Sequence, residues 1–412
     1  MNPGASIEPS PEIVSRTFRV EMVRAVAAGW METAMATFAI LIAVRAFDSG
    51  PTAKAILLGS YAVGMIGSLF VVPLAANTGW RVNRLAGAIA LVSSLGFCVA
   101  ALFPKSEGLF VIGMCVGFVG MALPLPLQTQ YLRENFPDAR RGRLFSRTLL
   151  VRASSSMAFA ALGGWLLDLH FDWFPWIIAA FAVAAMVSAI CYWSVPRLPA
   201  TDRGIPSRRV ALFRAMRWIR LDRPFRLVLL SAMAMGTGVL TANALRVDYL
   251  VNPQHGLVYD AKLVAFITGI LPSAIRVLST LWWGNWFDRA DFFRLRILVN
   301  VLFGVAIALY FSTSWLWAIV AGAVLFGFAR GGGEILWNLW VTKLAEPEHV
   351  GEYMSVHTFL TGLRALAGPF IGFYLVAFSS VKALTVFSLF FVSVALMILW
   401  PLVRRRPVSA SR

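Results

Sequence analysis

Six stretches of the chain, each at least 20 residues long, contain no Asp, Glu, Lys or Arg: residues 55–80, 85–104, 108–132, 173–196, 297–329 and 383–403. A helix needs about 20 apolar residues to cross the hydrocarbon core of a bilayer. Lipid cannot satisfy backbone polar groups, and none of these stretches alternates every second residue as a barrel strand does. The stretches therefore predict transmembrane α-helices.

The number of spans follows from two further features. Ser312-Thr313-Ser314 divides the stretch 297–329, which is too long for one crossing. Five more apolar segments carry isolated charges, at about residues 22–45, 147–168, 226–248, 262–287 and 353–378. The sequence thus predicts an all-α membrane protein with twelve spans. The composition excludes an ordinary soluble protein, because 59% of residues are apolar and only 14% are charged, against about 45–50% and about 25% in soluble domains.

The net charge of +17 is explained by the position of the basic residues. With the N-terminus in the cytoplasm, cytoplasmic segments hold 26 basic residues and the opposite side holds five, including Arg45 and Lys54. This asymmetry follows the positive-inside rule and predicts an inner-membrane protein with both termini cytoplasmic. Residues 1–20 lack the pattern of a signal peptide and are predicted to be a cytoplasmic tail. No basic soluble domain is left to bind nucleic acid, so no nucleic-acid partner is expected.

Residues 197–225 form the longest polar stretch, and they separate six spans from six. The predicted organisation is therefore a tail and six-helix bundle over 1–196, a cytoplasmic linker over 197–225, and a six-helix bundle with a basic tail over 226–412. Within the linker, residues 209–221 alternate arginines and apolar residues at helical spacing. This pattern is typical of a basic amphipathic helix on an anionic inner leaflet, and a solvated tether without regular structure is the alternative.

Three motifs in the second half resemble patterns of the major facilitator superfamily. Gly284-x-x-x-Asp288-Arg289, followed by Arg294, is similar to the loop signature of that family at the end of a span. Arg330-Gly-Gly-Gly-Glu334 resembles its Arg-and-glycine motif, and Gly368-Pro369-x-x-Gly372 resembles its antiporter kink motif. The matching loop of the first half departs from the signature, because Thr78-Gly79 replaces the acidic and basic pair.

The resemblance implies a fold of two pseudo-symmetric six-helix bundles that rock about a midplane site lined by spans 1, 4, 7 and 10. Spans 3, 6, 9 and 12 would then face lipid, and their predicted interiors contain no charged residue or His. The resemblance also implies a conformational latch formed by Gly284, Asp288, Arg289 and Arg294, whose contacts form in one state and break in the other.

Charged residues inside predicted spans are the candidates for solute binding and proton coupling, because each needs a partner or a watery cavity. They are Glu32 in span 1, Arg276 in span 8, Arg330 and Glu334 with the polar Asn338 in span 10, and Arg364 in span 11. Glu32 either exchanges a proton or pairs structurally with an Arg. Arg330 and Glu334 either neutralise each other as an i,i+4 pair or act as a proton-controlled switch.

These residues predict a secondary transporter of a small organic solute, coupled to protons, without a cofactor or metal, working as a monomer. The chain has none of the common metal, phosphate-loop or nucleophile-elbow motifs, so an enzyme is not expected. Three alternatives stay open: an antiporter that exports drugs or metabolites, a carrier that takes up organic anions or sugars, and a receptor that kept the fold without transport.

Overall fold

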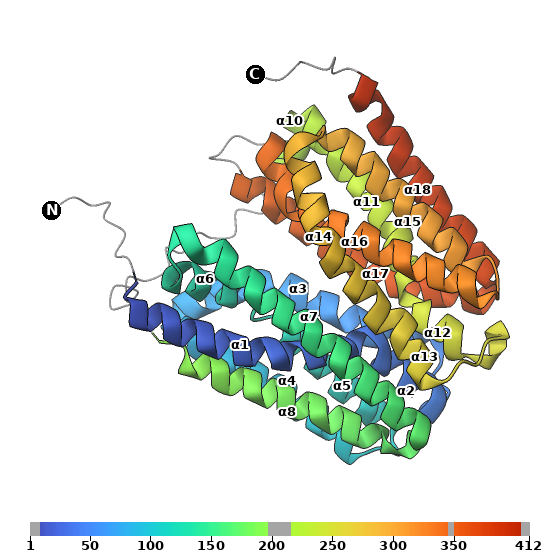
Figure 1. Ribbon diagram of the computed structural model, residues 1–412, viewed down its shortest axis with the longest axis horizontal. Helices are drawn as coiled ribbons and strands as arrows, with labels where there is room; N and C mark the ends of the chain where they lie inside the picture. Colours follow the sequence, from blue (N-terminus) through green and yellow to red (C-terminus); the bar gives the residue numbers. More distant parts are fainter. Residues whose placement is uncertain (1–8, 197–215, 345–349, 405–412) are drawn as a thin grey trace. The chain divides into compact units, whose positions relative to one another are not determined.

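The computed structural model describes residues 9–196, 216–344 and 350–404, and this part of the chain folds into α-helices with short 3-10 and π segments and no strand (Figure 1). Twelve helical segments within it are long and apolar enough to cross a membrane, from Pro11–Phe47 to Val381–Leu402. The predicted all-helical class and the twelve spans are confirmed.

The chain divides into two compact units, Met1–Ala39 with Ser60–Arg209, and Ile40–Gly59 with Val210–Arg412. The end of span 1 and the start of span 2 therefore belong to the same unit as the C-terminal spans. The bundle boundaries at 196 and 226 stay a prediction, and residues 197–215 of the linker lie outside the described residues. Of the amphipathic helix predicted over 209–221, the structure describes the end, α10 (Arg217–Leu221).

The first six spans are built from eight α-helices: α1 (Pro11–Thr33), α2 (Ala39–Phe47), α3 (Pro51–Thr78), α4 (Val82–Leu102), α5 (Glu107–Ala122), α6 (Leu125–Asn135), α7 (Asp138–Leu169) and α8 (Phe174–Ser194). The last six spans are built from α11 (Arg223–Ala244), α12 (Arg246–Val251), α13 (Ala261–Ala265), α14 (Leu271–Arg289), α15 (Phe292–Phe311), α16 (Leu316–Leu344), α17 (Val350–Phe378) and α18 (Val381–Arg404).

Equivalent pairs of helices pack together in both units, as expected for an internal repeat (Figure 1). In the first unit α1 packs on α7 and α8, and α4 packs on α5 and α8. In the second unit α11 packs on α17 and α18, and α15 packs on α16 and α18. The first span of each unit thus contacts the fifth and sixth, and the third contacts the fourth and sixth.

Two details of span 1 differ from the sequence prediction. The helix begins at Pro11, well inside the predicted tail, because Ser10 caps it by accepting a hydrogen bond from the N–H of Ile13 (3.4 Å) and proline suits the first helical position. The span also contains a π segment, Ala34–Phe38, and span 8 contains another, Phe266–Ile270. The chain enters the second unit two residues after the first π segment ends.

Candidate functional site

Glu32 pairs with Arg152 inside the first unit. Nε of Arg152 on α7 donates to Oε2 of Glu32 on α1 (2.9 Å), and the two side chains are 39% and 16% exposed. Gly29 makes this approach possible, since a Cβ there would lie 2.5 Å from the carbonyl oxygen of Arg152. The structural partner that the sequence could not identify for Glu32 is therefore Arg152, 120 residues away.

A second carboxylate of span 1, Glu21, lies in a buried network that the sequence analysis missed. Its side chain is 1% exposed. It accepts two hydrogen bonds from Arg24 (3.0 and 2.9 Å), one from Gln128 (3.2 Å) and one from the hydroxyl of Tyr131. The guanidinium of Arg24 also lies over the ring of Tyr192, 5.4 Å from its centroid. The available signal was Glu21 and Arg24 at i,i+3, on either side of the predicted start of the span.

In the second unit Glu334 bridges two arginines. Nη1 of Arg276 on α14 donates to Oε1 of Glu334 on α16 (3.0 Å), and Nε of Arg330 donates to the same oxygen (3.3 Å). The Arg276 side chain is 11% exposed, and those of Glu334 and Arg330 are 48% and 45% exposed. Gly327 lets the helices approach, since a Cβ there would lie 2.5 Å from the carbonyl oxygen of Pro272. The structure thus brings three predicted residues together in one cluster.

Arg364 on α17 lies apart from this cluster. Its guanidinium donates to the carbonyl oxygen of Ala232 on α11 and to Oγ1 of Thr361 (3.3 Å), beside Gly236. His357 lies seven residues before Arg364 on the same face of α17. It is 1% exposed, and its ring lies near Trp337 (5.4 Å) and Trp340 (5.2 Å). The hydrogen bond from Arg364 to Ala232 joins α17 to α11. Asn338 lies on α16, and its side chain is outside the described part.

The predicted latch residues lie at the end of α14 and the start of α15. Gly284, Asp288 and Arg289 belong to the last turns of α14, and the side chain of Asp288 is outside the described part. Arg289 and Arg294 are exposed. Between the two helices, Asp291 is the N-cap of α15: its carboxylate accepts hydrogen bonds from the N–H groups of Phe293 (3.0 Å) and Arg294 (3.1 Å). The latch stays a prediction.

A buried ion cluster in the second unit was also missed. Nζ of Lys54 donates to Oδ1 of Asp248 (2.6 Å), and Nε2 of His255 lies 2.9 Å from Oδ2. The side chains of Lys54, Asp248 and His255 are 8%, 2% and 8% exposed. The Lys54 ammonium also lies over the ring of Phe373 (5.2 Å). From the sequence, Lys54 was predicted only as a basic residue of the outer side, because its partner Asp248 is 194 positions away.

Twelve apolar spans in two repeated units, with ion pairs between helices inside each unit, define a multi-pass helical membrane protein. Comparison with known proteins identifies its family. The family model of the Major Facilitator Superfamily matches residues 25–298, more than half of the chain. The chain belongs to the major facilitator superfamily, whose fold is that of transporters rather than enzymes.

Individual relatives agree with this assignment. An uncharacterized MFS-type transporter of Bacillus subtilis (strain 168), YybF, is 23% identical over 322 residues, which cover 75% of this chain and 76% of YybF. The nucleoside transporter NupG has a similar structure, with a TM-score of 0.72, 11% identity and coverage of 95% of this chain and 98% of NupG. A D-xylose-proton symporter has a TM-score of 0.69, 15% identity and coverage of 93% and 97%. These structures share the fold with this chain.

Proposed function

We propose that this chain is a secondary active transporter that moves a small organic solute across the cytoplasmic membrane by alternating access, coupled to protons. Both termini would lie in the cytoplasm, as the distribution of 26 basic residues against five predicts. No phosphate-binding loop supplies ATP energy, so an ion or solute gradient has to drive the cycle.

The observation that carries the proton coupling is the ion pair of Glu32 and Arg152. It joins α1 to α7 within the first unit at 2.9 Å. A proton that binds Glu32 neutralises the carboxylate and leaves the guanidinium of Arg152 without its counter-charge. The pair would then separate, and the contact between the two helices would weaken. Such a charge change is the kind of local event that biases a two-state element.

The cluster of Arg276, Arg330 and Glu334 is the proposed solute contact in the second unit. Two guanidinium groups contact one carboxylate, and both are donors that suit an acidic or hydrogen-bonding solute. A solute with an acidic or hydrogen-bonding group can replace one of the two contacts between an arginine and Glu334. The half-exposed side chains of Arg330 and Glu334 make the cluster accessible to a small molecule.

The test is flux in liposomes that enclose a pH-sensitive dye. Purified protein is challenged with small organic acids, sugars, nucleosides and lipophilic amines, and solute-dependent proton movement is recorded. We expect Glu32→Gln to abolish proton movement, because the amide cannot exchange a proton, while solute binding persists. Glu12→Gln is the matched control, since Glu12 is exposed near the helix start. Proton-coupled flux that survives Glu32→Gln would contradict the assignment, and an absence of flux with every solute would favour a receptor.

A further inference from the structure

Spans 1 and 2 do not stay within the first unit along their whole length. Residues Ile40–Gly59, which comprise α2, the turn after it and the start of α3, are grouped with the second unit. The positive-inside count assigns this segment, which carries Arg45 and Lys54, to the outer side of the membrane. The segment thus belongs to the first six spans by sequence and to the second unit by packing. We call residues 40–59 the clasp.

Three polar contacts attach the clasp to the spans of the second unit. They are Lys54 with Asp248 (2.6 Å), Arg45 with the carbonyl oxygen of Tyr259, and the hydroxyl of Thr52 with that of Tyr374 (2.7 Å). The first contact joins opposite charges on side chains that are at most 8% exposed. Apolar contacts between helices give little preference for one partner in a membrane, because lipid tails are equally apolar. We therefore infer that the polar contacts, and the buried ion pair above all, fix the position of the clasp.

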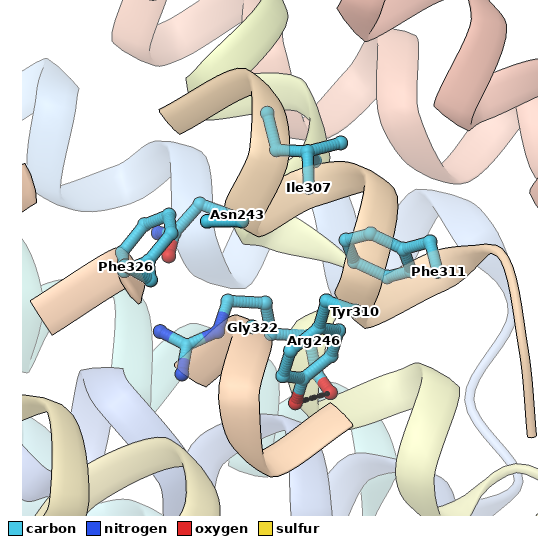
Figure 2. Close-up of a pocket in the computed structure, with 9 residues that line it drawn as sticks. Asn243, Arg246, Ile307, Tyr310, Phe311, Gly322 and Phe326 are labelled. Atoms are coloured by element: carbon cyan, nitrogen blue, oxygen red, sulfur yellow. Dashed lines mark hydrogen bonds between the residues drawn. The ribbon is translucent and has the colours of Figure 1, made fainter. Parts of the chain in front are cut away.

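The ion pair attaches the clasp to a firmly held part of the second unit. Asp248 lies on α12, whose six residues are all buried. Nη2 of Arg246, the first residue of α12, donates to the carbonyl oxygen of Ile267 in the π segment of span 8 (3.2 Å). The hydroxyl of Tyr310 in span 9 donates to the carbonyl oxygen of Arg246 (3.1 Å; Figure 2). Because α12 is bonded to two further spans, we expect a separation of the pair to move the clasp rather than α12.

The covalent path makes the clasp follow the first unit. The helix α3 runs from Pro51 to Thr78, and it passes from the second unit to the first between Gly59 and Ser60. Since the helix continues through this passage, Lys54 moves with the residues that follow Ser60. In span 1 the π segment Ala34–Phe38 lies directly before the corresponding passage. Such segments occur frequently at functional sites, and this one gives span 1 a joint beside the clasp.

We propose that the clasp is the outer gate of the transporter and that the ion pair of Lys54 and Asp248 holds it closed. Alternating access requires one repeat to rock against the other. Rocking of the first unit draws α3, and Lys54 with it, away from Asp248, so the outer side opens only when the pair breaks. The inference rests on the proposed function and deepens it, because it names the contact that has to break for access from outside.

The test is a distance measurement between two spin labels by pulsed electron paramagnetic resonance. The full chain is held in phosphatidylcholine nanodiscs, with its native cysteines replaced. One label is placed on the clasp at Gly50→Cys and the other at Lys382→Cys on α18, both at exposed positions. We expect Asp248→Asn to raise the ratio of long to short distances about tenfold to a hundredfold, the range for a lost hydrogen bond to a charged group.

A control pair and a second variant separate opening of the clasp from general loosening. The labels Val258→Cys and Lys382→Cys both lie outside the clasp, and their distances should not change in Asp248→Asn. The exchange of charges, Lys54→Asp with Asp248→Lys, should restore the short distance at Gly50. Short distances that persist in Asp248→Asn while its melting temperature falls would overturn the proposal, since the pair would then be only structural. An equal change in the control pair would also overturn it.

A cross-link tests the clasp with the ion pair intact and keeps the two proposals apart. Thr52→Cys and Tyr374→Cys replace two residues that share a hydrogen bond, and a short, reducible bis-methanethiosulfonate joins them. Flux of the solute panel through liposomes should stop on cross-linking and return on reduction, whereas the treated single-cysteine variants should keep their flux. Flux through the cross-linked protein would contradict the clasp and leave the transporter standing. A clasp that opens in Asp248→Asn, in a protein without flux of any solute, would contradict the transporter and leave the clasp standing.

Discussion

The ion pair of Lys54 and Asp248 gives a quantitative test of how the second unit is held together. Asp248 is almost completely buried, and Lys54 is only 6% exposed, so neither charge has water to replace its partner. Asp248→Asn keeps the size of the side chain and removes its charge. The change leaves the ammonium of Lys54 buried without a counter-charge, which typically costs about 3–5 kcal/mol.

The other single change should cost less. Lys54→Met leaves Asp248 with His255, whose ring lies 2.9 Å from the carboxylate. The ring of His255 still contacts the carboxylate, so the loss of stability should be smaller than in Asp248→Asn. The double variant buries no unpaired charge at this point. We expect it to be more stable than the sum of the single variants predicts, with a coupling of about 1–3 kcal/mol.

Two assays read out the effect. Melting of the purified protein gives the order of stability of the four proteins. Labelling of Ser49→Cys by a maleimide, with Cys98, Cys115 and Cys191 replaced, reports opening of the segment that holds Lys54, because Ser49 is 5% exposed. Since each 1.36 kcal/mol is a factor of ten, a loss of about 3 kcal/mol corresponds to roughly a hundredfold faster labelling. Unchanged labelling in Asp248→Asn, or strictly additive losses in the double variant, would refute the reasoning.

Two other substitutions test packing around buried charges. Glu21→Gln should destabilise the first unit by about 3–5 kcal/mol, because Arg24 is left buried without its carboxylate, whereas Glu12→Gln at an exposed site should change the melting temperature little. Gly236→Ala should displace the guanidinium of Arg364, which occupies the space of the new Cβ, and should lower the stability by about 1–3 kcal/mol. Gly142→Ala is the control, because no atom lies near its new Cβ, and it should be neutral or slightly stabilising. Equal melting temperatures of these two alanine variants would count against the close contact at Gly236.

The number and class of the spans were readable from the sequence because lipid imposes a local rule. Each segment has to be long, apolar and internally hydrogen-bonded, and all three properties lie within about 20 consecutive residues. The pair of Arg330 and Glu334 was readable for the same reason, since residues four apart on a helix are neighbours. The start of span 1 was misjudged, because capping by Ser10 extends the helix through a polar segment.

The partners of the intramembrane charges were decided only by tertiary structure. Glu32 meets Arg152, Arg276 meets Glu334, and Lys54 meets Asp248 over 58 to 194 positions of sequence. Such pairs depend on the rotation and crossing point of each helix, which close contacts at small residues such as Gly29 and Gly327 control. Hydropathy carries no information on these angles. Local sequence patterns therefore establish that charges lie within the spans, and the packing of the helices decides which of these charges neutralise one another.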